Sequence, residues 1–216
     1  MTRRAALITG LSCLGLAAVL AVLVGMSAPF PEALDEAWNG AMGGLRLPGL
    51  VGFALAMNVI GGGWVATFLI PLAIAGLALW RRGWRHALFA LVAFAGSAVA
   101  VQGIKHLLGR ARPEDLLVAS DFGSFPSGHT ANAATIAVVL WILFPGRGAV
   151  LGGIVWIVAM AFSRTVLSVH WFSDTVGGAL VGVGVGLVLA AAFWAWVGPA
   201  RRREVAGPPT PSVPGR

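Results

Sequence analysis

Two histidines and an aspartate in the second half of the sequence are spaced like an acid–base set. His170 is followed four residues later by Asp174, and His129 stands in the segment 126–130. A carboxylate next to one imidazole nitrogen sets the ring's tautomer and leaves the other nitrogen free to act as nucleophile or base. We expect His170 to react as a neutral imidazole, with Asp174 beside it on one helix face. His129 is then the candidate general acid.

Three cations accompany these residues with few acids nearby. Lys105, Arg112 and Arg164 carry the ammonium and guanidinium groups that suit a tetrahedral oxyanion such as phosphate. Ser127 and Gly128 lead directly into an apolar run, and the first N–H groups of a helix are unpaired donors that favour an anion. These five residues are therefore predicted to bind a phosphoryl group.

Other polar residues near these positions have simpler interpretations. Arg110 is either part of the site or an anchor for lipid headgroups, and Asp121 is a loop residue or lines the entrance. His106 is predicted to be structural. His86 is predicted to lie at the opposite membrane face and to take no part in catalysis.

The composition indicates that part of the protein surface faces lipid and not water. Of 216 residues, 58% are hydrophobic and 11% are charged, whereas a soluble domain carries roughly 25% charged residues. This excludes an ordinary soluble enzyme, a disordered chain and a coiled coil. The single cysteine excludes a disulfide scaffold.

Six apolar runs predict an all-α, polytopic membrane protein with a bundle of six transmembrane helices. A crossing helix needs about 20 apolar residues. The predicted spans are 5–26, 64–80, 86–104, 130–144, 149–162 and 175–197. The weaker apolar stretch 47–60, next to Pro48 and three glycines, is predicted to be a re-entrant or interfacial helix.

The distribution of charge predicts the orientation. With the N-terminus in the cytoplasm, most arginines fall inside and all acids but Glu204 fall outside. Both termini are then cytoplasmic, and the polar cluster lies at the extracytoplasmic face of the cell membrane. The net charge of +7 is therefore a topology signal, and we expect no nucleic-acid partner. The alternative for residues 1–26 is a cleaved export signal that begins with Arg3 and Arg4.

The motifs in this order resemble the type 2 phosphatidic acid phosphatase superfamily, which also includes vanadium haloperoxidases. Its signature is Lys, six residues, Arg-Pro; then Pro-Ser-Gly-His; then Ser-Arg, five residues, His, three residues, Asp. The matching positions here are Lys105, Arg112, Pro113, Pro126, Ser127, Gly128, His129, Ser163, Arg164, His170 and Asp174. The resemblance covers roughly 61–187, the motif core of a single predicted membrane-embedded domain, 1–197. A disordered cytoplasmic tail, 198–216, is predicted to follow.

The resemblance implies a phosphatase that needs no metal and no cofactor. His170 would form a phosphohistidine and Asp174 would orient it, while His129 would protonate the leaving oxygen and later activate water. Lys105, Arg112 and Arg164 would hold the phosphoryl oxygens, assisted by Ser127 and Gly128.

The predicted function is an integral-membrane lipid phosphatase. Its expected partners are the bilayer and a lipid phosphate or pyrophosphate, of the undecaprenyl pyrophosphate, phosphatidylglycerol phosphate or phosphatidic acid class. The alternatives are a phosphotransferase that uses the same phosphohistidine, a vanadate-dependent haloperoxidase, or a non-catalytic lipid-binding or scaffold protein. The glycines at 178, 182 and 186 are interpreted as a helix-packing face, either inside the bundle or in a homodimer.

Overall fold

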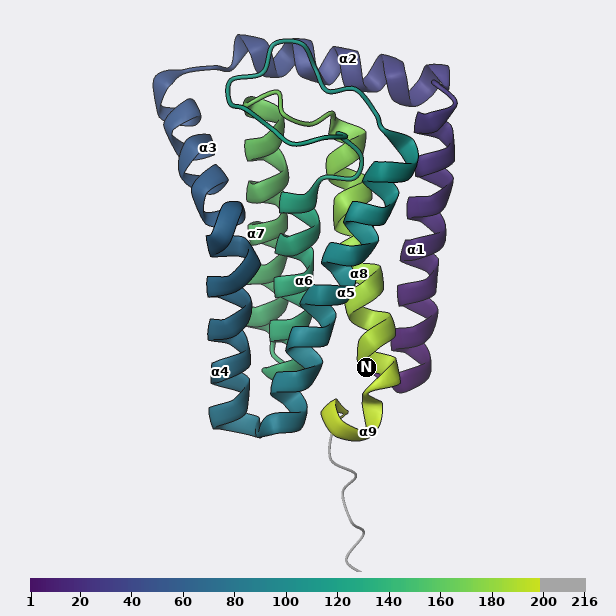
Figure 1. Cartoon of the computed structure of the whole chain (residues 1–216), viewed down its shortest axis with the longest axis vertical. Helices are drawn as coiled ribbons and strands as arrows, with labels where there is room; N and C mark the ends of the chain where they lie inside the picture. The colour runs from purple at the N-terminus through teal and green to yellow at the C-terminus, as the bar shows by residue number, and fades with distance from the viewer. Residues whose placement is uncertain (199–216) are drawn as a thin grey trace, which may run out of the picture.

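The computed structural model describes residues 1–198, and these form only helices, turns and loops, as the predicted all-α class requires. The helices are α1 (Arg3–Gly25), α2 (Pro29–Gly44), α3 (Pro48–Gly61), the π-helix η1 (Val65–Leu69), α4 (Ile70–Arg82), α5 (Trp84–Leu108), α6 (Gly128–Leu143), α7 (Arg147–Val166), α8 (Phe172–Ala192) and α9 (Trp194–Val197). The upright helices form a bundle with the long connection between α5 and α6 folded over one end (Figure 1). The predicted tail lies outside the described residues, apart from Gly198.

Within residues 1–198, five helical segments are long and apolar enough to cross a membrane: α1, η1 with α4, α5, α7 and α8. The fourth predicted span, α6, has only 16 residues. At 1.5 Å per residue it is about 24 Å long, short of a hydrocarbon core of about 30 Å. Figure 1 shows its upper end below the upper ends of α7 and α8. The N-terminus of α6 therefore starts inside the bundle.

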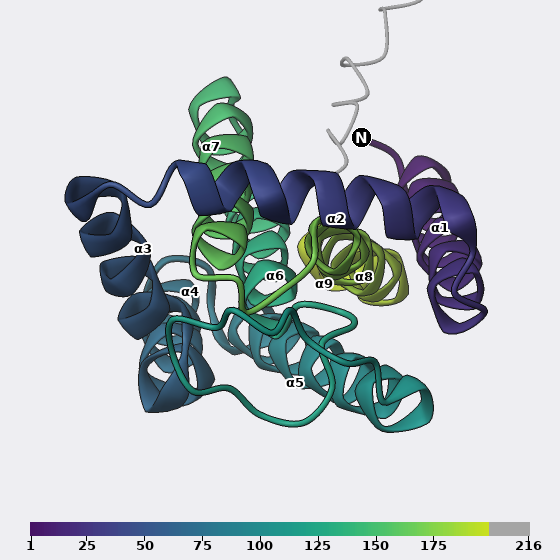
Figure 2. The ribbon, with the colours of Figure 1, turned by 90° about the horizontal axis from the view of Figure 1, so that it is seen from above.

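Helix α2 lies across one end of the upright helices and turns into α3 through 118° (Figures 1 and 2). Sequence reasoning predicted a short helix at 47–60, which corresponds to α3, but it did not predict α2. The local signals are Pro29 at the first turn of α2 and Glu32 within that turn, both favourable at a helix N-terminus.

Below α3, the chain continues through η1 into α4. The N–H of Ile70 bonds to the carbonyl of Val65, five residues back. Pro71 follows and has no N–H to donate, so the wider π turn occurs where an ordinary helical ladder would be interrupted. The predicted span 64–80 is therefore a helix with a π-helical turn at its N-terminal end.

Helix α8 packs against α1, α2, α5, α6 and α7. A Cβ atom added at Gly178 would lie 2.4 Å from the carbonyl oxygen of Ser127, and one at Gly182 would lie 2.2 Å from that of Ala131. The glycines thus let the backbones of α6 and α8 approach closely. The glycine face packs inside the bundle, one of the two uses expected for it.

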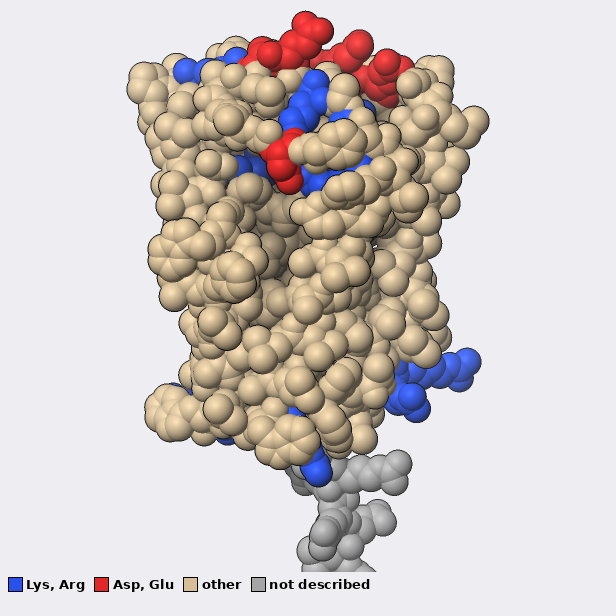
Figure 3. Space-filling view, viewed as in Figure 1, with Lys and Arg blue, Asp and Glu red and all other residues tan. Residues whose placement is uncertain are grey.

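The charged side chains gather at the two ends of the bundle, with an apolar band between them (Figure 3). In the view shown, acidic side chains occur only at the end that α2 covers, together with basic ones. This end carries all the polar motifs that the sequence singled out.

Replacing Gly182 with alanine is expected to destabilise the bundle, because the new methyl group would overlap the α6 backbone. Overpacking of this kind costs about 1–3 kcal/mol. Gly152→Ala on α7 is the matched control, since nothing lies within 4 Å of a Cβ at that position. Thermal unfolding of both variants in detergent measures the difference, and equal melting temperatures would contradict close α6–α8 contact.

Candidate active site

The loop after α5 folds back over Lys105 and Arg112. Gly123 has a φ of +70°, a backbone conformation that glycine adopts without strain. Its carbonyl oxygen accepts hydrogen bonds from Lys105 Nζ at 2.9 Å and from Arg112 Nη2 at 2.8 Å. A glycine turn thus holds two cations from different segments side by side.

Asp121 neutralises part of this positive charge. Its Oδ1 lies 3.1 Å from Lys105 Nζ and 2.6 Å from Arg112 Nη2. Burial alone would raise the pKa of Asp121, but the charge and hydrogen bond of Lys105 outweigh it and hold the pKa below its usual value. Asp121 is in the loop after α5, with 61% of its side chain exposed, which agrees with the first of the two interpretations left open by the sequence.

His170 lies between Arg112 and Asp174. Its Nε2 is 3.4 Å from Arg112 Nη1, and its Nδ1 is 3.5 Å from Asp174 Oδ2. An arginine can only donate, so the contact favours a ring that carries its proton on Nδ1, facing the carboxylate. Burial lowers the pKa of His170, and the weaker opposing effect of Asp174 does not reverse it. This agrees with the expected neutral imidazole.

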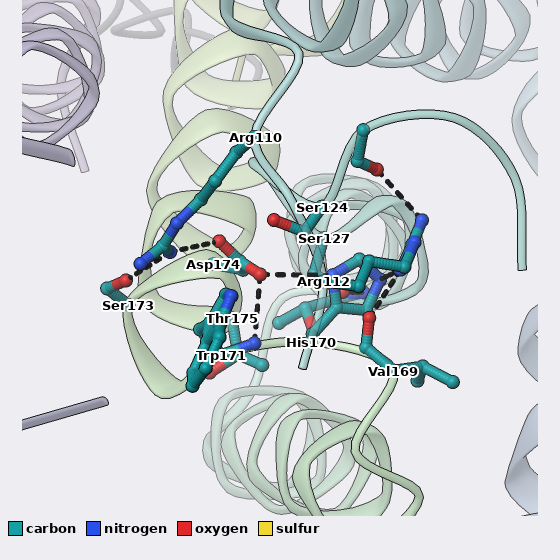
Figure 4. A network of polar contacts seen from close by, with 12 residues as sticks. Arg110, Arg112, Ser124, Ser127, Val169, His170, Trp171, Ser173, Asp174 and Thr175 are labelled. Atoms are coloured by element: carbon teal, nitrogen blue, oxygen red, sulfur yellow. Dashed lines mark hydrogen bonds and ion pairs between the residues drawn. The ribbon is translucent and has the colours of Figure 1, made fainter. Parts of the chain in front are cut away.

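The expectation that His170 and Asp174 share a helix face is wrong. Helix α8 begins at Phe172, so His170 belongs to the preceding loop. Asp174 is the third residue of the helix, and its Oδ2 accepts a bond from the N–H of Trp171 at 2.9 Å. The carboxylate therefore caps the helix and reaches back toward the imidazole (Figure 4).

Arg164 is buried without a carboxylate partner. Its side chain is in the last turn of α7 and the residue is 0% exposed. It donates only to neutral oxygens: Ser163 Oγ, Asn58 Oδ1 at 2.7 Å and the carbonyl of Ala54 at 3.1 Å. Within residues 1–198, no acid lies within ion-pair distance of this guanidinium. An uncompensated buried cation is costly, and an anionic ligand would compensate it.

His129 lies in the first turn of α6, next to the break after α3. Its Nε2 is 3.4 Å from the carbonyl oxygen of Asn58, and a Cβ atom at Gly62 would lie 2.8 Å from that same Nε2. His129 is also within electrostatic range of Arg164 and His170. Asn58 therefore connects the candidate general acid with the buried cation.

Ser127 and Gly128 begin α6 as expected. Ser127 is fully buried, and its Oγ accepts hydrogen bonds from the N–H of Thr130 at 3.4 Å and from the Thr130 hydroxyl at 3.1 Å. A Cβ atom at Gly128 would meet only Val101, at an ordinary 3.7 Å. The packing of the protein thus leaves space beside Gly128.

The structure brings most of the predicted site residues into two groups of direct contacts, one around Arg112 and His170 and one around Arg164 and His129. Direct contacts link Lys105 and Arg112 through Asp121, and Arg112 with His170. Asn58 links His129 with Arg164. Ser127 joins the first group through its N–H, which donates to the Asp174 carbonyl at 2.9 Å.

Sequence reasoning missed Asn58 and Asp35, and it left Arg110 undecided. Arg110 contacts Asp174 at 2.6 Å, so it belongs to the site. No motif spacing points to Asn58 or Asp35, because they come from the segment before the motifs. His106 bonds the carbonyl of Gln102 at 2.8 Å, one helical turn earlier, which supports a structural role.

Comparison with known proteins identifies one family. A family model described as the PAP2 superfamily matches residues 86–198. Phosphatidylglycerophosphatase B of Bacillus subtilis (strain 168) is 30% identical over 167 residues, which cover 70% of this chain and 79% of the relative. Decaprenylphosphoryl-5-phosphoribose phosphatase of Mycobacterium tuberculosis (strain H37Rv) is 30% identical over 148 residues, or 66% and 80% of the two chains.

A solved structure is also similar over most of its length. The crystal structure of a transmembrane PAP2-type phosphatidylglycerolphosphate phosphatase from Bacillus subtilis matches with a TM-score of 0.73 at 27% identity. The match covers 84% of this chain and 94% of that one.

The imidazole of His170 is expected to titrate below the ordinary histidine value of about 6.5, because burial disfavours its charged form. Histidine-labelled protein in detergent would show this by NMR, with the His170 signal assigned by its loss in His170→Gln. A midpoint at or above 6.5 would contradict the ring environment described here.

Proposed function

The chain belongs to the PAP2 superfamily and is a membrane phosphatase, and we propose that it hydrolyses a phosphomonoester of a membrane lipid through a phosphohistidine. The observation that carries the lipid assignment is a groove of about 580 Å³. It is lined mostly by apolar side chains of η1, α4 and α5, and it ends at Gly128 and His129.

The groove has the length and polarity of a site for an apolar chain. Along α5 it extends from Gln102 to Leu91, which at 1.5 Å per residue is about 16 Å. Phe68, Leu72 and Phe94 are among the residues that line it. A lipid tail in this groove would place its phosphate at the polar end, beside His129.

The polar end offers an excess of positive charge. Asp121 is shared by two cations, Lys105 and Arg112, and Arg164 has only neutral partners. A dianionic phosphate would therefore be held by all three cations in a setting from which water is largely excluded. The open space beside Gly128 leaves the first N–H groups of α6 accessible to its oxygens.

In the proposed reaction, Nε2 of His170 attacks phosphorus while the bond from phosphorus to the lipid oxygen breaks. His129 gives its proton to the departing oxygen, so an alcohol leaves. His129 then takes a proton from water, whose oxygen attacks the phosphohistidine and releases inorganic phosphate and free His170. Asp174 keeps Nδ1 of His170 protonated throughout.

Two further observations support the substrate class and its location. The relatives named above act on phosphomonoesters of lipids, according to their names, which favours a phosphomonoester over undecaprenyl pyrophosphate. Six arginines lie at helix ends away from the site (Figure 1): Arg3 and Arg4 at the start of α1, Arg81 and Arg82 at the end of α4, Arg85 at the start of α5 and Arg147 at the start of α7. By the positive-inside rule, the end of the bundle that carries them is cytoplasmic and the site is extracytoplasmic.

Alanine at His170 or His129 is expected to lower phosphate release from phosphatidylglycerophosphate or phosphatidic acid by about a thousandfold, since each would remove a reacting group. His106→Ala is the control, because that side chain bonds only within α5. Wild-type turnover in His170→Ala would exclude the phosphohistidine. Labelled phosphate trapped on the wild type by acid-free denaturation, and absent from His170→Ala, would support it.

Filling the groove is expected to separate lipid from soluble substrates. Ala98→Trp places a large side chain in the groove, whereas Val99→Trp changes the adjacent residue, which is 73% exposed and does not line it. We expect Ala98→Trp to lose about tenfold or more in kcat/KM for phosphatidylglycerophosphate and to retain activity on para-nitrophenyl phosphate. An equal loss on both substrates, or an equal effect of Val99→Trp, would contradict tail binding in the groove.

A further inference from the structure

Asp35 is a fully buried carboxylate on α2, and it is only 1% exposed. Its Oδ1 accepts a hydrogen bond from the N–H of Ser173 at 2.8 Å. Its Oδ2 accepts from the Ser173 hydroxyl at 2.6 Å and from Arg110 Nη2 at 2.8 Å. All three donors belong to the loop and helix start that carry the site, although Asp35 comes from a helix with none of the family motifs.

Arg110 links Asp35 to Asp174 by bonding both carboxylates. While Nη2 bonds Asp35, Nη1 bonds Asp174 Oδ1 at 2.6 Å and Ser173 Oγ at 2.8 Å (Figure 4). The guanidinium also lies over the ring of Trp171, 5.5 Å from its centre. The planar guanidinium group is suited to bridging Asp35 and Asp174, because it presents two donors in fixed directions to the two carboxylates.

Asp174 is held at both oxygens as a result. Arg110 bonds Oδ1, and the N–H of Trp171 bonds Oδ2, the oxygen that faces Nδ1 of His170. The carboxylate can neither rotate nor shift without breaking one of these bonds. The separation of 3.5 Å between Oδ2 and the imidazole is thus set by contacts from residues that the motif signature does not specify.

We infer that Asp35 and Arg110 are a positioning pair. Asp35 fixes the orientation of the Arg110 guanidinium, and the guanidinium holds the Asp174 carboxylate next to His170. The inference rests on the proposed function, in which His170 is the reacting group. Neither side chain needs to touch the phosphate, so the pair should affect turnover rather than binding.

A second ion pair on the same face serves as the reference for a purely structural contact. Asp115 bonds Arg46 at 2.7 Å and Asn39 at 3.1 Å, tying the α2–α3 region to the loop after α5. Arg46 continues to the Val166 carbonyl at 3.3 Å and to Ser168. This pair joins the same parts of the fold as the Asp35 pair but reaches none of the reacting groups.

The test measures kcat and KM of the purified full-length protein in detergent with para-nitrophenyl phosphate. Asp35→Asn is expected to lower kcat about tenfold or more, with KM within about twofold of wild type. Asp115→Asn makes the same chemical change in the reference pair and is expected to stay within about twofold in both. Asp115 is 44% exposed and Asp35 is buried, so thermal unfolding of both variants is measured alongside, and a loss of kcat in folded Asp35→Asn is the result that a structural role alone does not produce.

Arg110→Lys separates geometry from charge. It keeps a positive charge but cannot bridge two carboxylates with a planar fork, so kcat should fall as in Asp35→Asn. If Asp35→Asn does not fold, as judged by thermal unfolding, Arg110→Lys decides the matter by the same criterion. Wild-type kcat in the folded Arg110→Lys would overturn the inference.

The pH at which kcat/KM falls on the acid side of its profile, the acid limb, gives a further test. Loss of packing alone would not change this pH. The charged groups that face His170 are Asp174, Arg112, Lys105, Asp121 and His129. Asp35→Asn and Arg110→Lys are both expected to loosen Asp174, whose hydrogen bond and charge raise the pKa of His170, so the limb should move to lower pH in both variants. Asp115→Asn leaves the contacts of Asp174 intact, and its limb should stay in place. The ionisation of the substrate is common to all variants and cancels in the comparison.

His170→Ala, measured in parallel, distinguishes this inference from the proposed function. If His170→Ala is inactive while Asp35→Asn behaves like wild type, only the positioning pair is refuted. If His170→Ala retains wild-type activity, the phosphohistidine proposal itself fails.

Discussion

The cost of burying positive charge governs the end of the bundle that α2 covers. Removing an ion from water costs several kcal/mol unless partners compensate it. Lys105 and Arg112 share Asp121, and Arg110 lies between Asp35 and Asp174. Among the basic side chains of the part of the chain that the structure describes, only Arg164 is fully buried with neutral oxygens as its sole partners. The compensation is therefore uneven, and the surplus of positive charge lies where a phosphoryl group would bind.

The short α6 brings this surplus next to the apolar groove. Because α6 has 16 residues and begins inside the bundle, Gly128 and His129 lie below the ends of the longer helices. The groove between η1, α4 and α5 reaches the same two residues from the side. Gly128 and His129 therefore border both a charged and an apolar environment. A lipid phosphate has the matching two parts, a charged phosphate and an apolar chain.

Much of this arrangement could be predicted from the sequence because the motif residues adjoin the ends of apolar runs. Helix α8 instead starts at Phe172, since the Asp174 carboxylate caps it, and this excluded the predicted shared face with His170. Asp35 and Asn58 could not be predicted. Their contacts join residues 138 and 106 positions apart, and no local periodicity encodes pairs at that separation.

The segment before the family-model match completes the site. Asp35 and Asn58 both precede residue 86, where the match begins, yet one compensates Arg110 and the other holds Arg164 and faces His129. Substitutions in α2 and α3 can therefore alter the charge and geometry around the reacting groups while every motif residue stays the same. Two chains with identical motifs need not have identical sites, because part of each site comes from helices that the motifs do not include.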